Sequence, residues 1–174
     1  MDGILFKKLT SDHIDAYKKI RRECILNYPN NFGTKACELD NYDKKYKDII
    51  NHSSSGSFVM GAFDSNKLIG ITGFLREGRK KAQHRGELVQ VYVDPKYSGK
   101  GIGTRLILHT LEEAFQNIEI EQILLSAVRS NDAATRMYEK IGFKIYGIVE
   151  QYFKDNNEYW DQIFMTLNRK DFRK

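Results

Sequence analysis

The sequence of 174 residues has few cysteines, few prolines and no long apolar run. The two cysteines, Cys24 and Cys37, are too few for a disulfide framework and lack the spacing of zinc ligands, so we expect no metal. With only two prolines, no proline-rich linker divides the chain, and a single domain over residues 1–174 is expected. No apolar run reaches the roughly 18 residues of a membrane span, so we expect no membrane partner.

The beginning of the sequence also lacks a targeting signal. Met1-Asp2-Gly3 is followed by neither the basic segment nor the apolar segment of a secretory leader, which predicts a cytoplasmic location. Cys24 lies within a helical pattern, so a packed thiol is expected there rather than a nucleophile.

Positive charge is in excess but is not concentrated. The net charge is +5 and the pI about 9.1, which suits either a nucleic-acid binder or a protein with a polyanionic cofactor. The basic clusters, Lys18-Lys19 with Arg21-Arg22 and Arg79-Lys80-Lys81, are short and typical of solvated surface. No concentrated basic helix or aromatic-plus-arginine motif is present, so we expect no nucleic acid.

Hydrophobic periodicity and turn residues predict an alternation of strands and helices. Strands are expected at residues 4–9, 57–63, 68–75, 87–93, 120–128, 142–153 and 159–167, and helices at 11–27, 38–50, 101–116 and 131–140. A helix joins strand 87–93 to strand 120–128, so these two should be parallel, whereas the other neighbours should be antiparallel. The predicted fold class is therefore mixed α/β (α+β), with helices on both faces of one sheet.

Three glycines stand at alternate positions, Gly99, Gly101 and Gly103, between a valine-rich strand and an amphipathic helix. Closely spaced glycines let backbone N–H groups converge, and the start of a helix adds unpaired donors and the positive end of its dipole. The loop therefore predicts an anion site, most naturally for phosphate. Its spacing matches neither a dinucleotide fingerprint nor a P-loop. A turn that serves only to reverse the chain is the alternative.

Two segments carry a family resemblance. The stretch 91–106 resembles the acetyl-CoA motif of the GNAT (Gcn5-related N-acetyltransferase) family, whose pattern Arg/Gln-x-x-Gly-x-Gly/Ala aligns with Ser98-Gly99-Lys100-Gly101-Ile102-Gly103. Ser98 departs from the usual Arg or Gln. The stretch 131–143 resembles the family block Asn-x-x-Ala-x-x-x-Tyr-x-x-x-Gly-Phe. The resemblance covers nearly the whole chain and implies a GNAT fold, with six to seven mostly antiparallel strands, about four flanking helices, and a splayed fourth and fifth strand.

The resemblance implies a function and a cofactor site. It implies transfer of the acetyl group of acetyl-CoA to a primary amine of a small molecule, a peptide or a protein. The residues implied for cofactor binding are Val91, Tyr92 and Val93, the loop Ser98, Gly99, Lys100, Gly101, Ile102, Gly103 and Thr104, and the pair Asn131 and Tyr138. The Val91 or Tyr92 N–H would polarise the thioester oxygen, and Asn131 would cap its helix and touch the cofactor's arm.

Tyr138 is the implied general acid toward the departing thiolate, although Tyr138 also belongs to an apolar helical stripe that packing alone would explain. Glu87 is the candidate general base, because it stands where the histone-modifying branch of the family carries a glutamate. In strand periodicity Glu87 shares a face with Val89, Val91 and Val93, which would desolvate the Glu87 carboxylate and raise its pKa. A bulge in this strand would change which of these residues share a face. Glu150, His84, Tyr92 and a water relay are the alternatives.

The acceptor stays open. The family shapes its acceptor pocket with the N-terminal helices and the last hairpin, which hold Tyr28, Asn30, Phe32, Tyr152, Asp155, Glu158, Tyr159 and Trp160 here. From this set we predict Tyr28, Phe32 and Tyr152 as acceptor contacts, and we add Glu87, the candidate base. Polyamine, amino-acid, antibiotic and protein N-terminal acceptors all fit this set, and a homodimer is left open. The alternative function is a catalytically silent sensor of acyl-CoA.

Overall fold

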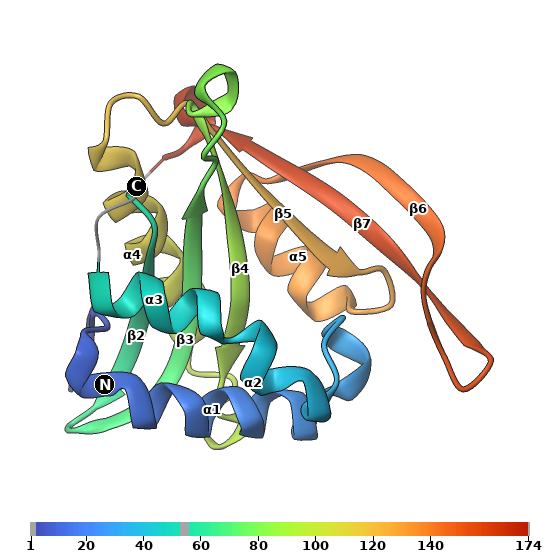
Figure 1. Ribbon diagram of the computed structural model, residues 1–174. Helices are drawn as coiled ribbons and strands as arrows, with labels where there is room; N and C mark the ends of the chain where they lie inside the picture. Colours follow the sequence, from blue (N-terminus) through green and yellow to red (C-terminus); the bar gives the residue numbers. More distant parts are fainter. Residues whose placement is uncertain (1–2, 53–55, 174) are drawn as a thin grey trace.

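The computed structural model describes residues 3–52 and 56–173 (Figure 1). Residues 1–2, which belong to the segment predicted to lack a secretory leader, lie outside the described residues. So do the loop residues 53–55. The strands are β1 Ile4–Lys8, β2 Phe58–Asp64, β3 Lys67–Arg76, β4 Arg85–Val93, β5 Gln122–Val128, β6 Lys144–Asp155 and β7 Glu158–Asn168. The helices are α1 Ile14–Asn27, α2 Leu39–Tyr42, α3 Lys44–His52, α4 Ile102–Gln116 and α5 Asp132–Ile141.

The seven strands form one sheet in the order β1-β2-β3-β4-β5-β7-β6. Only β4 and β5 pair in parallel, while the other neighbouring pairs are antiparallel. The predicted mixed, mostly antiparallel sheet is therefore confirmed. The described residues contain no helix that is both long and apolar enough to cross a membrane.

Helices cover the two faces of the sheet and close two apolar clusters (Figure 1). On one face α4 and α5 pack on the strands through residues such as Leu106, Leu111 and Ile141. On the other face α1 and α3 pack through Tyr17, Cys24 and Ile50 among others. β4 contributes to both clusters, so a ligand that lies along β4 can be reached from either layer.

The predicted helix 38–50 is wrong in one respect, because the chain there is divided into a 3-10 turn, α2 and α3. Asp43 stands between α2 and α3, and its carboxylate turns inward to accept a hydrogen bond from Arg21 Nε at 3.2 Å. The two side chains are only 3% and 4% exposed. The prediction of a solvated basic cluster is therefore wrong for Arg21, which sits on the buried face of α1 with Tyr17 and Cys24.

Replacing Asp43 with alanine should leave the Arg21 guanidinium buried without its counter-ion. We expect the free energy of unfolding to fall by about 3–5 kcal/mol, measured by urea denaturation at neutral pH. The matched control is Asp15→Ala on the same layer, because the Asp15 side chain is 98% exposed, and its expected change is within about 0.5 kcal/mol. Similar losses in both variants would contradict the importance of the buried pair.

Candidate functional site

The site is a cleft between β4 and β5. These strands pair only at Arg85↔Gln122, Gly86↔Ile123 and Glu87↔Leu124, and then diverge (Figure 1). β4 stays paired with β3, and β5 stays paired with β7, so the opening lies inside the sheet. The cleft has a volume of about 740 Å³, within the range of small-molecule sites.

A bulge at Gln90 shapes the β4 wall of this cleft. The register against β3 shifts between Ile71 and Gly73, and Gln90 has a φ of 58°. A left-handed conformation in a residue other than glycine costs on the order of 1–3 kcal/mol, so the surrounding contacts must hold it. One such contact is the hydroxyl of the fully buried Tyr17, which donates to Gln90 Oε1 at 3.2 Å.

The bulge corrects the predicted face of Glu87. Val91 and Val93 pack toward the α4 cluster, whereas Val89 and Tyr92 pack toward the α1 cluster. Because side chains alternate along a strand, Glu87 shares its face with Val89 and, across the bulge, with Tyr92. The expected grouping of Glu87 with Val91 and Val93 is therefore wrong. The extra residue at the bulge is the physical reason.

The same strand directs backbone donors into the cleft. Asp94 N–H donates to Ile69 O of β3 at 2.8 Å, and Tyr92 is paired with Ile71 of the same strand. Because alternate N–H groups point to the same side of a strand, those of Val91 and Val93 point away from β3, toward the gap. This alternation favours the Val91 N–H over the Tyr92 N–H as the predicted donor to the thioester oxygen.

The glycine loop closes one end of the cleft. Gly99 and Gly101 have φ values of 75° and 70°, and a Cβ atom at either position would project into open space. α4 begins at Ile102, and no described group accepts a hydrogen bond from the backbone N–H groups of residues 99–104. Lys100 does not line the cleft, because its ammonium lies 5.2 Å from the centre of the Tyr97 ring. The loop therefore offers main-chain donors rather than side-chain charge.

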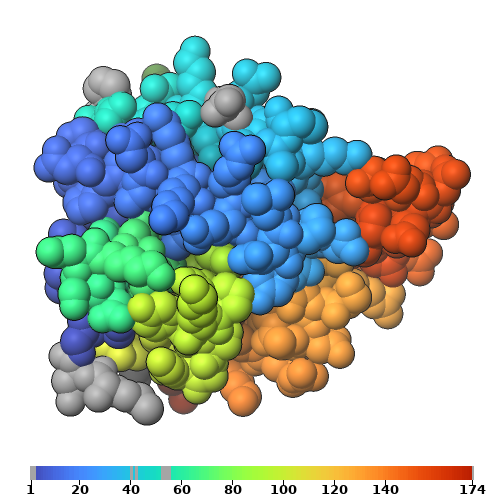
Figure 2. All heavy atoms as spheres, turned by 90° about the horizontal axis from the view of Figure 1, so that it is seen from below, coloured from blue at the N-terminus to red at the C-terminus, as the bar shows by residue number. Residues whose placement is uncertain are grey.

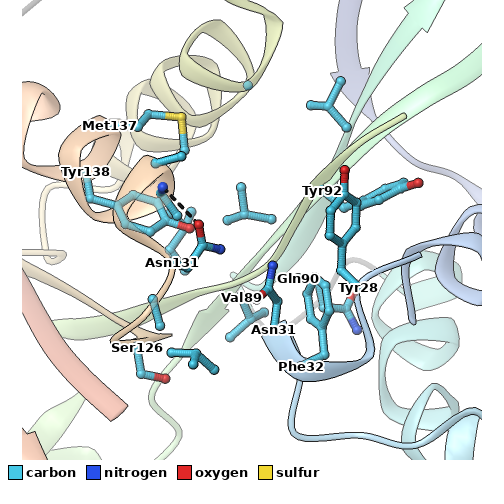
Figure 3. Close-up of a pocket in the computed structure, with 18 of the residues that line it drawn as sticks. Tyr28, Asn31, Phe32, Val89, Gln90, Tyr92, Ser126, Asn131, Met137 and Tyr138 are labelled. Carbon is cyan, nitrogen blue, oxygen red and sulfur yellow. Dashed lines mark hydrogen bonds between the residues drawn. The ribbon is translucent and has the colours of Figure 1, made fainter. Parts of the chain in front are cut away.

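α5 supplies the opposite wall (Figure 3). Asn131 caps this helix, since its Oδ1 accepts the N–H of Ala134 at 3.2 Å. Tyr138 is 6% exposed, and its ring packs against Phe143 with the centroids 6.0 Å apart. Tyr138 also lines the cleft, and its hydroxyl has no hydrogen-bond partner among the described residues. Burial raises the pKa of the Tyr138 phenol, so it keeps its proton at neutral pH.

Tyr28, Phe32 and Tyr152, the residues predicted as acceptor contacts together with Glu87, line the same cleft from the loop after α1 and from β6. Asn30, Asp155 and Trp160 instead line an adjoining cavity of about 320 Å³. Lys35 Nζ contacts Asp155 Oδ1 at 2.6 Å, which ties the loop to the hairpin β6–β7 (Figure 2). His84 and Glu150, two of the alternative bases, do not line the cleft.

Glu87 lies where β4 and β5 still pair, at the narrow end of the cleft. Desolvation raises the pKa of the Glu87 carboxyl, and the Lys45 ammonium of α3 opposes this shift. The side chain nevertheless keeps an exposed surface, so it is shielded by the cleft walls rather than enclosed. A carboxylate with a raised pKa is suited to accept a proton.

The residues that line the cleft without having been predicted include Arg21, Gln90 and Gln162. Arg21 could have been found from its helical spacing to Tyr17 and Cys24. No local signal in the sequence marks Gln90 or Gln162, because the placement of Gln90 depends on the bulge and that of Gln162 on the pairing of β7. Cys24 is packed as predicted, since it has no exposed surface and burial raises the pKa of its thiol to about 12.

Comparisons with known proteins agree with this geometry. A sequence model described as the acetyltransferase (GNAT) family matches residues 17–143. The chain is 31% identical over 102 residues to the N-alpha-acetyltransferase RimI of Mycobacterium tuberculosis, covering 59% of this chain and 61% of that protein. It is 29% identical over 84 residues to the spermidine N(1)-acetyltransferase of Escherichia coli, covering 48% of this chain and 45% of that protein.

The fold is also found in a protein from Salmonella typhimurium that was solved with its cofactor acetyl-CoA. The TM-score is 0.81 at 19% identity, covering 95% of this chain and 93% of that one. The two sequence matches span less than two thirds of either relative.

Proposed function

The chain belongs to the acetyltransferase (GNAT) family, and from that premise we propose that it transfers the acetyl group of acetyl-CoA to a primary amine. The observation that carries the proposal is the opening between β4 and β5, which leaves the Val91 and Val93 N–H groups facing a cleft instead of a strand. An extended ligand arm can pair with such an edge as an added strand would.

The residues present fit acetyl-CoA. Its pyrophosphate needs converging donors, and the unpaired N–H groups of residues 99–104 lie at the positive end of α4. The backbone at Gly99 and Gly101 borders open space, so a ligand can approach it closely. When bound, acetyl-CoA supplies an acetyl group activated as a thioester. Ser98 lines the cleft without a charge, so main-chain donors carry the binding there.

We assign four roles to the chain's own groups. The Val91 N–H stabilises negative charge that develops on the acetyl oxygen. The Tyr138 hydroxyl, protonated at neutral pH and without another partner, donates its proton to the departing sulfur. Glu87 accepts a proton from the incoming ammonium, directly or through water, from the acceptor side of the sheet. Asn131 keeps the first turn of α5 in place beneath the cofactor's arm.

The proposal is tested by titrating the purified protein with acetyl-CoA in a calorimeter and then measuring CoA thiol release with a panel of primary amines. We expect saturable binding and amine-dependent release. Absence of acetyl-CoA binding would overturn the proposal. Binding without release for every amine would favour the alternative of a silent sensor, which no observation in the cleft supports.

The Tyr138→Phe variant keeps the ring that packs on Phe143 and removes only the hydroxyl. We expect kcat to fall by roughly 100-fold or more, because a general acid typically contributes that much, while the Kd for acetyl-CoA stays within about twofold. The matched control is Tyr159→Phe, at the exposed end of the hairpin. If Tyr138→Phe changes kcat no more than the control variant does, the Tyr138 side chain serves only in packing.

The pH dependence tests Glu87. Because burial raises its pKa, the carboxylate is lost at a higher pH than in an ordinary glutamate, and base catalysis should decline as pH falls through that value. We expect the acid limb of the kcat/KM profile to lie above the usual glutamate range and to disappear in Glu87→Gln. Glu121→Gln, at an exposed position outside the cleft, should keep the wild-type profile. An unchanged limb in Glu87→Gln would assign the base elsewhere.

A further inference from the structure

The charges that line the cleft are few. Among the described residues, Glu87 is the only carboxylate in its walls and Arg21 is the only cation. The remaining polar groups are amides, hydroxyls and phenols, including those of Asn31, Ser126 and Gln162. A ligand that matches this lining carries one positive charge on an otherwise uncharged polar body.

The single cation is already engaged. Arg21 Nε donates to Asp43, and Arg21 Nη1 lies 3.8 Å from Cys24 Sγ, with the guanidinium almost fully buried. A free carboxylate on a ligand would have to compete with Asp43 for this guanidinium. On the side facing α3, Lys45 lies close enough to Glu87 to affect its pKa. A second ammonium near Glu87 would therefore meet positive charge rather than another carboxylate.

Two buried amide atoms in the cleft walls lack partners. Gln90 Nε2 is an unpaired donor, because the Tyr17 hydroxyl engages only Oε1. Gln162 Oε1 is an unpaired acceptor on β7, and its side chain is 7% exposed. Such buried atoms are uncommon and costly unless a ligand or water completes them. Both amides can reach a ligand by rotating about their terminal torsions.

These unpaired atoms lie on the acceptor face of the sheet. Ile163, Met165 and Leu167 of β7 point into the α4 cluster, so Gln162 points to the opposite face by strand alternation. The Gln90 side chain points to that same face, where it meets Tyr17 of α1. Each amide carries an NH₂ donor and an oxygen acceptor, which together complement a peptide group's C=O and N–H.

We propose that the acceptor is the free N-terminal segment of a peptide or protein. Its α-ammonium is held at Glu87, and its first peptide groups are bound by Gln90 and Gln162. This inference rests on the proposed function and adds its substrate class. In the transfer, the amine nitrogen bonds to the acetyl carbon, the carbon–sulfur bond breaks, and the net proton lost from the amine ends on the sulfur.

Other amines fit the cleft less well. A polyamine or an aminoglycoside brings several ammonium groups, whereas Glu87 is the only carboxylate among the described residues of the cleft, and Asp155 of the adjoining cavity is already paired with Lys35. A free amino acid brings a carboxylate for which no unengaged cation is present. The space also exceeds what one small amine fills, because the adjoining cavity shares Phe32, Thr34 and Phe153 with the cleft and continues it toward the hairpin.

The test compares three probes with the wild-type protein and acetyl-CoA: a neutral tripeptide with a free N-terminus and an amidated C-terminus, spermidine, and free alanine. We expect kcat/KM for CoA thiol release to be at least about tenfold higher for the tripeptide amide than for the other two, since buried polar groups discriminate strongly between partners. The same tripeptide with a formylated N-terminus should give no release.

A charge change should alter this preference. In Gln162→Glu a second carboxylate enters the acceptor face, and we expect the ratio of tripeptide to spermidine kcat/KM to fall by about tenfold. Gln116→Glu, at an exposed position on α4, is the matched control and should keep the wild-type ratio. Calorimetric binding of acetyl-CoA checks that both variants are folded, and the wild-type ratio decides the matter if Gln162→Glu is not.

The outcomes separate the two proposals. Faster release with spermidine or alanine than with the tripeptide amide, in a protein that binds acetyl-CoA, overturns the peptide acceptor and leaves the acetyltransferase standing. Failure to bind acetyl-CoA overturns both.

Discussion

The pairing of β4 with β5 stops after three residue pairs, and the cleft depends on that stop. Buried backbone groups without partners are costly, so two strands that begin side by side would normally continue to pair. Here the outer neighbours hold the strands on diverging courses: β4 follows β3, and β5 follows β7. The bulge at Gln90 then turns β4 so that its donors face the gap. The unpaired edge is thus an internal one, protected from other chains and open to a ligand of the right length.

The two sides of this gap use different chemistry. On the side of α4 and α5, main-chain donors and the phenols of Tyr97 and Tyr138 line the cleft, and no charged side chain of the described residues lines it there. On the side of α1 and α3, side chains form the wall of the cleft, and its charged residues among those described are Glu87 and Arg21, one of each sign. The buried pair Arg21–Asp43 matters here, because it adds a polar wall without adding net charge. The face of α4 and α5 thereby suits a single acetyl donor, whereas the face of α1 and α3 can discriminate among acceptors.

Local signals in the sequence were sufficient for the strands, for the helices other than the divided segment 38–50, for the glycine loop and for the cap at Asn131. Each depends on residues within one or two turns of each other, as the pairing of Asn131 with Ala134 illustrates. What could not be predicted depends on distant partners. Tyr17 meets Gln90 across 73 positions, and Arg21 meets Asp43 across 22. Because the bulge at Gln90 carries no local mark, the face of Glu87 was assigned from simple alternation and was wrong.

The glycine loop presents its N–H groups through its torsion angles rather than through side-chain identity, and this limits which substitutions the loop tolerates. The side chains of Ser98 and Lys100 are not needed to present a main-chain N–H. Gly99 and Gly101 are harder to replace, since most other residues are strained at a φ near 70°. Substitutions on one face of the sheet can therefore change the surface of the cleft without altering the torsion angles of the loop on the other face.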